Sequence, residues 1–219
     1  MFDTIIIGGG WSVSQGCDVR DLRAYGHVVG VNEAAVLCKV DVGLTMDRLW
    51  AENRWHQLMT QQPSAELWVR DGADKALPYH PRRRKFWCDH RAYVLSDEFN
   101  TFNGTNSGLC AINYAYQRRP KRVFLFGFDM CQGPLGEPYW YPPYPWASPK
   151  GGTKPPKYVK WAEQFYAVAD QLAKAHIEVF NVTTRSAIRA FPQITYCEFE
   201  GLVGKGRAEA QATPAPGGA

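Results

Sequence analysis

The chain has 219 residues, of which 45% are hydrophobic and 21% charged, and its formal net charge is +4 at neutral pH. This length suits one well-buried core and argues against two full domains. No apolar run approaches the roughly twenty residues that cross a bilayer, so no membrane span is expected. The positive charge suits an anionic small ligand, but its clusters at 82–85 and 118–122 are typical of solvated turns, not of a surface for nucleic acid.

The six cysteines are dispersed and form no CxxC pair. We interpret them as reduced thiols, not as a disulfide framework or a zinc site. The chain also passes from Met1 into an apolar run without the basic region that begins a secretory signal. Both observations favour a cytoplasmic protein.

The beginning of the chain alternates between strand and helix patterns. Thr4–Ile7 is a β-branched run that ends in glycines, which is typical of a buried strand and a tight turn. A short helix is expected over Asp18–Tyr25, with Gly26 at its end. A second strand over His27–Val31 leads into a helical turn at Glu33–Leu37.

A third strand is expected over Asp41–Met46, and a helix follows over Arg48–Gln62. Weaker strand patterns lie at 67–69 and 84–88. The large apolar side chains of the helix repeat at a helical spacing and are expected to face the core. They are Leu49, Trp50, Trp55 and Met59.

The second half of the chain continues the alternation. A helix is expected over Gly108–Gln117, and Arg122–Phe126 is the strongest candidate for a central strand. A long amphipathic helix over Tyr158–Ala175 precedes a last strand at Ile177–Val182. Residues 204–219 are rich in glycine, alanine and proline and are expected to form a flexible tail.

Strands separated by helices favour a parallel sheet covered on both faces, since a parallel crossover needs a dozen or more residues. The sequence therefore predicts an α/β fold, with residues 1–203 forming one Rossmann-like, three-layer, nucleotide-binding domain around a mostly parallel sheet. Ligands of such sheets bind at the carboxyl ends of the strands.

The loop after the first strand is the first candidate site. Small residues there let backbone amides approach an anion, and hydroxyls add donors. The candidates are Gly8, Gly9, Gly10, Ser12 and Ser14. The loop lacks the third glycine of the dinucleotide fingerprint and the Gly-Lys-Ser/Thr ending of a P-loop. A plain tight turn is the alternative.

A polar run before the helix at 108–117 is the second candidate. Its free amides and hydroxyls suit a phosphate or a ribose. The run comprises Thr105, Asn106, Ser107 and Gly108. Ordinary N-capping by Asn106 or Ser107 is the alternative, and capping and binding can coexist.

Two carboxylates form the third candidate. Asp129 follows Gly127 at the end of the strongest strand, and Asp47 ends the third strand. If they face each other they would share a Mg²⁺ ion, because hard cations prefer oxygen ligands. Each alone is more often a turn or capping aspartate.

A stretch rich in proline and aromatic residues at 131–156 is the fourth candidate. Aromatic rings provide stacking surfaces, and phenols donate to phosphate oxygens. We expect a lid over the site that carries Tyr139, Tyr141 and Tyr144, followed by Lys150, Lys154 and Lys157. The alternatives are an aromatic hook packed on the domain and a contact between copies in a homo-oligomer.

These landmarks occur in a particular order. The strand, glycine and serine run at 5–12 precedes Val31-Asn32, the Thr-Asn-Ser-Gly run at 105–108 and the Gly-Phe-Asp strand end at 127–129. In this order they resemble the bacterial sialyltransferase-like superfamily, which includes motility accessory factors and archaeal 6-hydroxymethylpterin pyrophosphokinase-like proteins. The resemblance covers roughly the first 130 residues.

The resemblance implies that the glycine loop and Asn32 contact a nucleotide, that Ser107 and Gly108 line the site, and that tyrosines of the lid bind phosphate. In the sialyltransferases a lid histidine is the general base, yet this chain has no histidine between His90 and His176. Asp129 or Asp47 is the substitute base that we consider here.

The leading hypothesis from the sequence is a transferase that uses a nucleotide or nucleotide-sugar donor, most simply a sialyltransferase-like glycosyltransferase. The first alternative is a Mg²⁺-dependent enzyme like the 6-hydroxymethylpterin pyrophosphokinases, because that chemistry needs carboxylates for a metal ion. The second is a non-catalytic binding or assembly protein that retains the fold, which the missing histidine favours.

Overall fold

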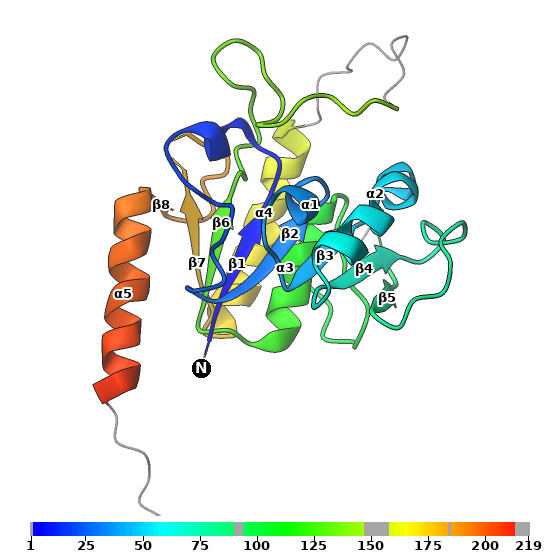
Figure 1. Ribbon diagram of the computed structural model, residues 1–219. Coiled ribbons are helices and arrows are strands. Elements are labelled where there is room, and N and C mark those ends of the chain that lie inside the picture. Colours follow the sequence, from blue (N-terminus) through cyan, green and yellow to red (C-terminus); the bar gives the residue numbers. More distant parts are fainter. Residues whose placement is uncertain (1, 90–93, 147–157, 184, 213–219) are drawn as a thin grey trace, which may run out of the picture.

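The computed structural model describes residues 2–89, 94–146, 158–183 and 185–212. Within these ranges one eight-stranded sheet has the order β5-β4-β3-β2-β1-β6-β7-β8, and all neighbouring strands are parallel (Figure 1). The strands are β1 (Asp3–Ile7), β2 (His27–Val31), β3 (Val42–Thr45), β4 (Glu66–Arg70), β5 (Arg83–Phe86), β6 (Arg122–Phe126), β7 (Glu178–Val182) and β8 (Gln193–Ile194).

Helices cover both faces of this sheet. They are the 3-10 helix η1 (Trp11–Ser14) and the α-helices α1 (Ala34–Leu37), α2 (Arg48–Gln61), α3 (Ser107–Arg118), α4 (Tyr158–Lys174) and α5 (Tyr196–Ala212). Side chains alternate across a strand, so β1 sends Ile6 to the core under α3 and α4 and sends Ile5 and Ile7 to the core under α1, α2 and α5. The three-layer α/β fold expected from the sequence is confirmed.

The strand order places a switch point at the centre of the sheet. From β1 the chain builds outward to β5 on one side, then returns to add β6 on the other side of β1. The loops that leave β1 and β6 therefore diverge at the carboxyl edge, which is where open α/β sheets bind ligands. The expected strands are all present, with ends that differ by a few residues.

The helix expected over 18–25 is wrong. This segment consists of turns, and Asp21 forms a parallel bridge with Lys39. The amide of Lys39 donates to the carbonyl of Arg20 at 2.7 Å, and Leu22 is buried. Pairing with a distant segment has overridden the local helix preference, which is a weak one.

The inward face of α2 also differs from the expectation. Trp50 and Met59 are buried, but Leu49 is 44% exposed and Leu58 takes an inward position. The indole Nε1 of Trp50 donates to the carboxylate of Glu33 at 3.0 Å. This buried contact sets the rotation of α2, and the hydrophobic spacing alone does not reveal it.

Helix α5 spans Tyr196–Ala212 and so includes residues 204–212 of the tail expected from the sequence, whereas residues 213–219 lie outside the described ranges. A capping box starts the helix: the amide of Thr195 donates to Glu198 at 2.7 Å and the amide of Glu198 donates to the Thr195 hydroxyl at 3.2 Å. This Thr-x-x-Glu signal was readable in the sequence.

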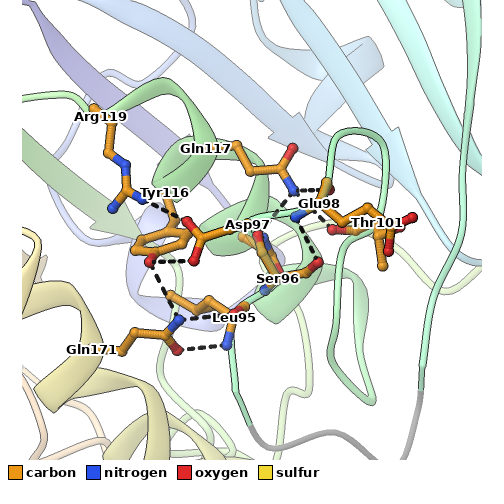
Figure 2. Close-up of polar contacts among 10 residues, drawn as sticks. Leu95, Ser96, Asp97, Glu98, Thr101, Tyr116, Gln117, Arg119 and Gln171 are labelled. Carbon is orange, nitrogen blue, oxygen red and sulfur yellow. Dashed lines mark hydrogen bonds and ion pairs between the residues drawn. The ribbon is translucent and has the colours of Figure 1, made fainter.

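The loop before α3 is fixed by side-chain amides of α3 and α4 (Figure 2). Nε2 of Gln117 donates to the carbonyls of Ser96, Glu98 and Thr101 at 2.7 to 3.0 Å. Gln171 accepts from the amide of Leu95 and donates to its carbonyl. These bonds place the start of α3 at the carboxyl edge of the sheet.

Among the helices of the described ranges, none has both the length and the apolar character that a bilayer crossing requires.

The close contact between β2 and α1 generates a stability prediction. A Cβ on Gly30 would lie 2.6 Å from Cα and 2.7 Å from the amide nitrogen of Ala35, so Gly30→Ala must move backbone. We expect a loss of roughly 1–3 kcal/mol in the free energy of unfolding, measured by urea denaturation. Gly201→Ala is the control, because it adds a methyl to open space on α5 and is expected to be neutral or to stabilise by up to about 1 kcal/mol. Equal effects of the two substitutions would contradict this packing.

Candidate functional site

A pocket of about 160 Å³ lies at the switch point. The loops after β1, β2 and β6, the start of α3, the aromatic stretch and α4 all contribute to its wall. The lining residues are Gly8, Gly9, Val31, Asn32, Asn106, Ser107, Gly108, Gly127, Phe128, Met130, Tyr139, Tyr141 and Trp161. Most of the residues predicted to bind a nucleotide therefore meet in one place.

The start of α3 supplies hydrogen-bond donors to this pocket. Asn106 is the N-cap, and its Oδ1 accepts from the amide of Leu109 at 3.0 Å. The amides of Ser107 and Gly108 begin the helix and have no intrahelical acceptor. The side-chain Nδ2 of Asn106 is buried and has no acceptor among the described residues. The side chain of Asn106 thus caps α3 through Oδ1 and keeps Nδ2 as a donor without a described acceptor.

The polar residues beside this helix start are held by their neighbours. The hydroxyl of Ser107 accepts from the amide of Met46 at 3.1 Å. Thr105 does not line the pocket, and its hydroxyl donates to the amide oxygen of Gln164 on α4. Asn32 has a left-handed backbone (φ 52°), and its Oδ1 accepts from a threonine hydroxyl of β3 at 2.7 Å. These bonds fix the pocket wall.

The glycine loop has a different role from the one expected. Its amides at Gly8 and Gly10 donate to the carbonyls of Phe126 and Gly127 at 2.7 and 2.9 Å, so they are not available to an anion. Of the three glycine amides, that of Gly9 alone has no acceptor among the described residues. The glycines are needed mainly for close packing, since a Cβ on Gly8 would lie 2.8 Å from a backbone oxygen.

The described part of the aromatic stretch, residues 131–146, packs on the domain. Trp140 donates from its indole Nε1 to the carbonyl of Gly8 at 3.1 Å and from its amide to the carbonyl of Gly9 at 3.3 Å. The rings of Tyr139 and Tyr141 are parallel, with centroids 5.2 Å apart. This half of the stretch therefore behaves as an aromatic hook. The lid stays a prediction, since residues 147–157, with Lys150, Lys154 and Lys157, lie outside the described ranges.

The tyrosines of the hook are linked to α2. Tyr141 and Tyr144 share a hydrogen bond between their hydroxyls at 3.1 Å, and the ring of Tyr144 stacks on Trp146. Arg54 lies 5.0 Å above Trp146 and pairs with Glu33 at 2.9 Å. Tyr144 does not line the pocket, so its role is to support Tyr141.

Burial raises the pKa of Tyr139 and Tyr141 above the ordinary phenol range. The carboxylate of Asp47 raises the pKa of Tyr139 further. Both phenols are therefore neutral at physiological pH, and each retains a proton that it can donate to an acceptor such as a phosphate oxygen.

Asp129 is buried behind the pocket, not in its wall. Its Oδ2 accepts from the amide of Ser12 at 2.7 Å, and its Oδ1 accepts from the Ser12 hydroxyl at 2.5 Å. Burial raises the pKa of Asp129, while the two bonds from Ser12 and the charge of Arg185 act in the opposite direction. Asp129 therefore anchors the turn that follows β1.

Asp47 has a separate structural task. It is the N-cap of α2, and its Oδ1 accepts from the amides of Leu49 and Trp50 at 2.9 and 3.3 Å. No contact joins it to Asp129 in the described ranges, and no group of three or more His, Cys, Asp or Glu side chains there is arranged to hold a metal ion. The residues present do not fit the Mg²⁺ site expected from the sequence.

Several other sequence predictions lie outside the pocket. Gly10 contacts the side chain of Asp129, and the exposed hydroxyl of Ser14 donates to the carbonyl of Trp11 at 2.8 Å. The sequence analysis missed four lining residues. These are Val31, Phe128, Met130 and Trp161. The first three adjoin predicted residues in sequence, whereas Trp161 reaches the pocket only because α4 packs beside β7.

The Ser12 contact generates a pH prediction. A carboxyl group whose pKa is raised on folding favours the folded state at low pH, and this stability is lost as the pH rises through the folded pKa. Ser12→Ala removes a donor that favours the ionised form, so it should raise the pKa of Asp129 further. We expect the variant to be less stable than wild type by about 1–3 kcal/mol at pH 8, with a smaller deficit near pH 4.

Urea denaturation across this pH range measures the difference. Ser14→Ala is the matched control, because its hydroxyl is exposed and bonds only within its own turn. A constant deficit for Ser12→Ala at every pH would contradict the assigned role of Asp129.

The carboxylate positions generate a prediction for metal ions. Millimolar Mg²⁺ or Mn²⁺ should leave the melting temperature of the protein unchanged, because Asp47 and Asp129 are held apart by their own hydrogen bonds. A rise in the melting temperature of wild type that Asp129→Asn lacks would instead restore the shared metal site.

Comparison with family models, with curated proteins and with solved structures finds no match to this chain. The likeness to the sialyltransferase-like superfamily thus rests on the order of motifs and stays a prediction.

Proposed function

We propose that the pocket at the switch point binds the phosphate of a nucleotide or nucleotide sugar, and that the protein is a transferase using such a donor. One observation carries this proposal. Asn106, Ser107 and Gly108 at the start of α3 line a pocket at the carboxyl edge of a parallel sheet, and among the described residues neither the amides of Ser107 and Gly108 nor the buried Nδ2 of Asn106 has an acceptor. Donors at the positive end of a helix favour an anion.

The remaining wall suits the same ligand class. Neutral phenols at Tyr139 and Tyr141 add donors, and none of the described lining residues is a carboxylate that would repel an anion. The volume of about 160 Å³ is below the several hundred Å³ typical of sites for whole small molecules. It suits the phosphate portion of a donor, with the base and the sugar lying outside this cavity.

Transfer to a hydroxyl acceptor needs a general base, and the lining offers neither a histidine nor a carboxylate. Asp129 is the candidate that adjoins the pocket in sequence, and its raised pKa is the shift that a base near neutral pH requires. Before Asp129 can accept a proton from the acceptor, its oxygens must give up their hydrogen bonds from the amide and the hydroxyl of Ser12. A sialyltransferase-like glycosyltransferase is therefore the proposed enzyme class, with Asp129 as its base.

The absence of a base from the lining favours a second candidate, a binding protein that holds a nucleotide without chemistry. The pyrophosphokinase-like alternative is supported less, because its metal ligands do not assemble among the described residues.

Nucleotide binding is tested by thermal shift with CMP, UDP, GDP and ATP. Binding at 100 times the dissociation constant should raise the melting temperature by roughly 5–10 °C. Asn106→Asp keeps the helix cap but replaces the donor by a negative oxygen, so it should abolish the shift. Asn53→Asp makes the same change at an exposed position of α2 and should retain it. If none of the nucleotides stabilises wild type, the proposal fails.

Chemistry is tested separately, by following release of the free nucleotide from CMP-, UDP- and GDP-sugars. A transferase should release it, and Asp129→Asn should slow the release at least tenfold while preserving the nucleotide-induced shift. Nucleotide binding without any release would favour the binding protein.

A further inference from the structure

Three sulfur atoms gather beside the first turns of α3. Sγ of Cys88 lies 3.8 Å from Sγ of Cys110, and Sγ of Cys110 lies 3.3 Å from Sδ of Met46. Cys110 is fully buried, whereas Cys88, which follows β5, is half-buried. One thiol of the close pair can therefore meet a small reagent from solvent, and the other lies directly behind it.

The two thiols differ in acidity. The hydrogen bond that Cys88 shares with Cys110 lowers the pKa of Cys88, and the charge of Arg70 lowers it further, against the effect of burial. Burial raises the pKa of Cys110 well above that of an ordinary thiol. Reactive redox cysteines are acidic and partly exposed and have a second cysteine within reach, and this pair has each of these properties.

We propose that Cys88 and Cys110 form a peroxide-sensitive dithiol, with Cys88 as the attacking sulfur and Cys110 as the resolving sulfur. The site is independent of the nucleotide pocket proposed above. Its reagent class is hydrogen peroxide or another small hydroperoxide.

The reaction has two balanced steps. The Cys88 thiolate attacks one peroxide oxygen, so that an S–O bond forms, the O–O bond breaks, and the leaving hydroxide takes up a proton to become water. The sulfur of Cys110 then attacks the Cys88 sulfenic acid, an S–S bond forms, and the hydroxyl leaves as a second water with the Cys110 proton. The dithiol loses two electrons, and peroxide is reduced to two waters.

The surroundings keep the required movement small. A disulfide needs its sulfurs about 2 Å apart, so the pair at 3.8 Å must approach by roughly another 2 Å. The described part of the loop between the two cysteines is held on α3 and α4 at 95–101 by Gln117 and Gln171 (Figure 2). The remaining approach is then expected from side-chain rotation and a local shift at Cys88.

The test uses the full chain with Cys17, Cys131 and Cys197 replaced by serine. After treatment with a one- to tenfold excess of hydrogen peroxide at pH 7, the protein is unfolded in urea and blocked with iodoacetamide, and the intact mass should show two fewer alkylated thiols than the untreated protein. Trypsin cuts between Cys88 and Cys110 at Arg91, so an unreduced digest should contain one linked peptide pair that dithiothreitol separates.

Two variants and one internal control make the result specific. Cys88→Ser should leave Cys110 unoxidised, whereas Cys110→Ala should leave Cys88 as a sulfenic acid that dimedone traps. Burial raises the pKa of Cys38 to about 12, and no second thiol contacts it, so peroxide should leave Cys38 of the folded described region unoxidised and unlinked. Should Cys88 and Cys110 stay unlinked after peroxide, or Cys88 overoxidise without a link, the sulfurs would be core packing only and the proposal would be overturned. Even if Cys110→Ala does not fold, the linked peptides from the chain that lacks only Cys17, Cys131 and Cys197 decide the question.

Discussion

The arrangement of the loops at the carboxyl edge of the sheet depends on how closely the chain segments that follow β1 and β6 approach each other. The amide of Gly10 donates to the carbonyl of Gly127 at 2.9 Å, and a Cβ on Gly10 would lie 2.6 Å from that oxygen. Only glycine allows two backbones to meet in this way. The contact brings Ser12 to Asp129 and leaves the carbonyl of Gly8 open to Trp140. The pocket is the space that remains above this junction.

The described residues that line the pocket combine apolar side chains with hydrogen-bond donors, and none of them is charged. Its donors come from the start of α3 and from phenols that burial keeps protonated, while the carboxylates of Asp47 and Asp129 are turned toward backbone amides elsewhere. Hydrogen bonds from Ser12 offset part of the free-energy cost of burying the ionised Asp129. Because burial outweighs them, the pKa of Asp129 is raised. The same fold thus keeps both carboxylates out of the described lining of the pocket.

How far the site could be predicted differs between its parts. Asn106, Ser107 and Gly108 were found because a polar, glycine-containing run before a helix implies free amides at a known place. The link from the tyrosines through Trp146 to Arg54 was not found, since it joins residues far apart in the chain by ring contacts that leave no spacing signal. The structural roles of Asp47 and Asp129 could not be predicted either, because a sequence does not distinguish a capping aspartate from a metal ligand.

The sequence by itself determined the alternation of strands and helices, and hence the parallel sheet and the edge that carries the pocket. Periodicity and chain length are local properties, and they limit how strands can be connected. Only the tertiary structure decided that 18–25 is not helical, that α2 turns Leu58 inward, and that glycine amides bond to β6 instead of awaiting a ligand. Each of these outcomes is set by a partner distant in sequence, and its energy is gained only when the chain has folded.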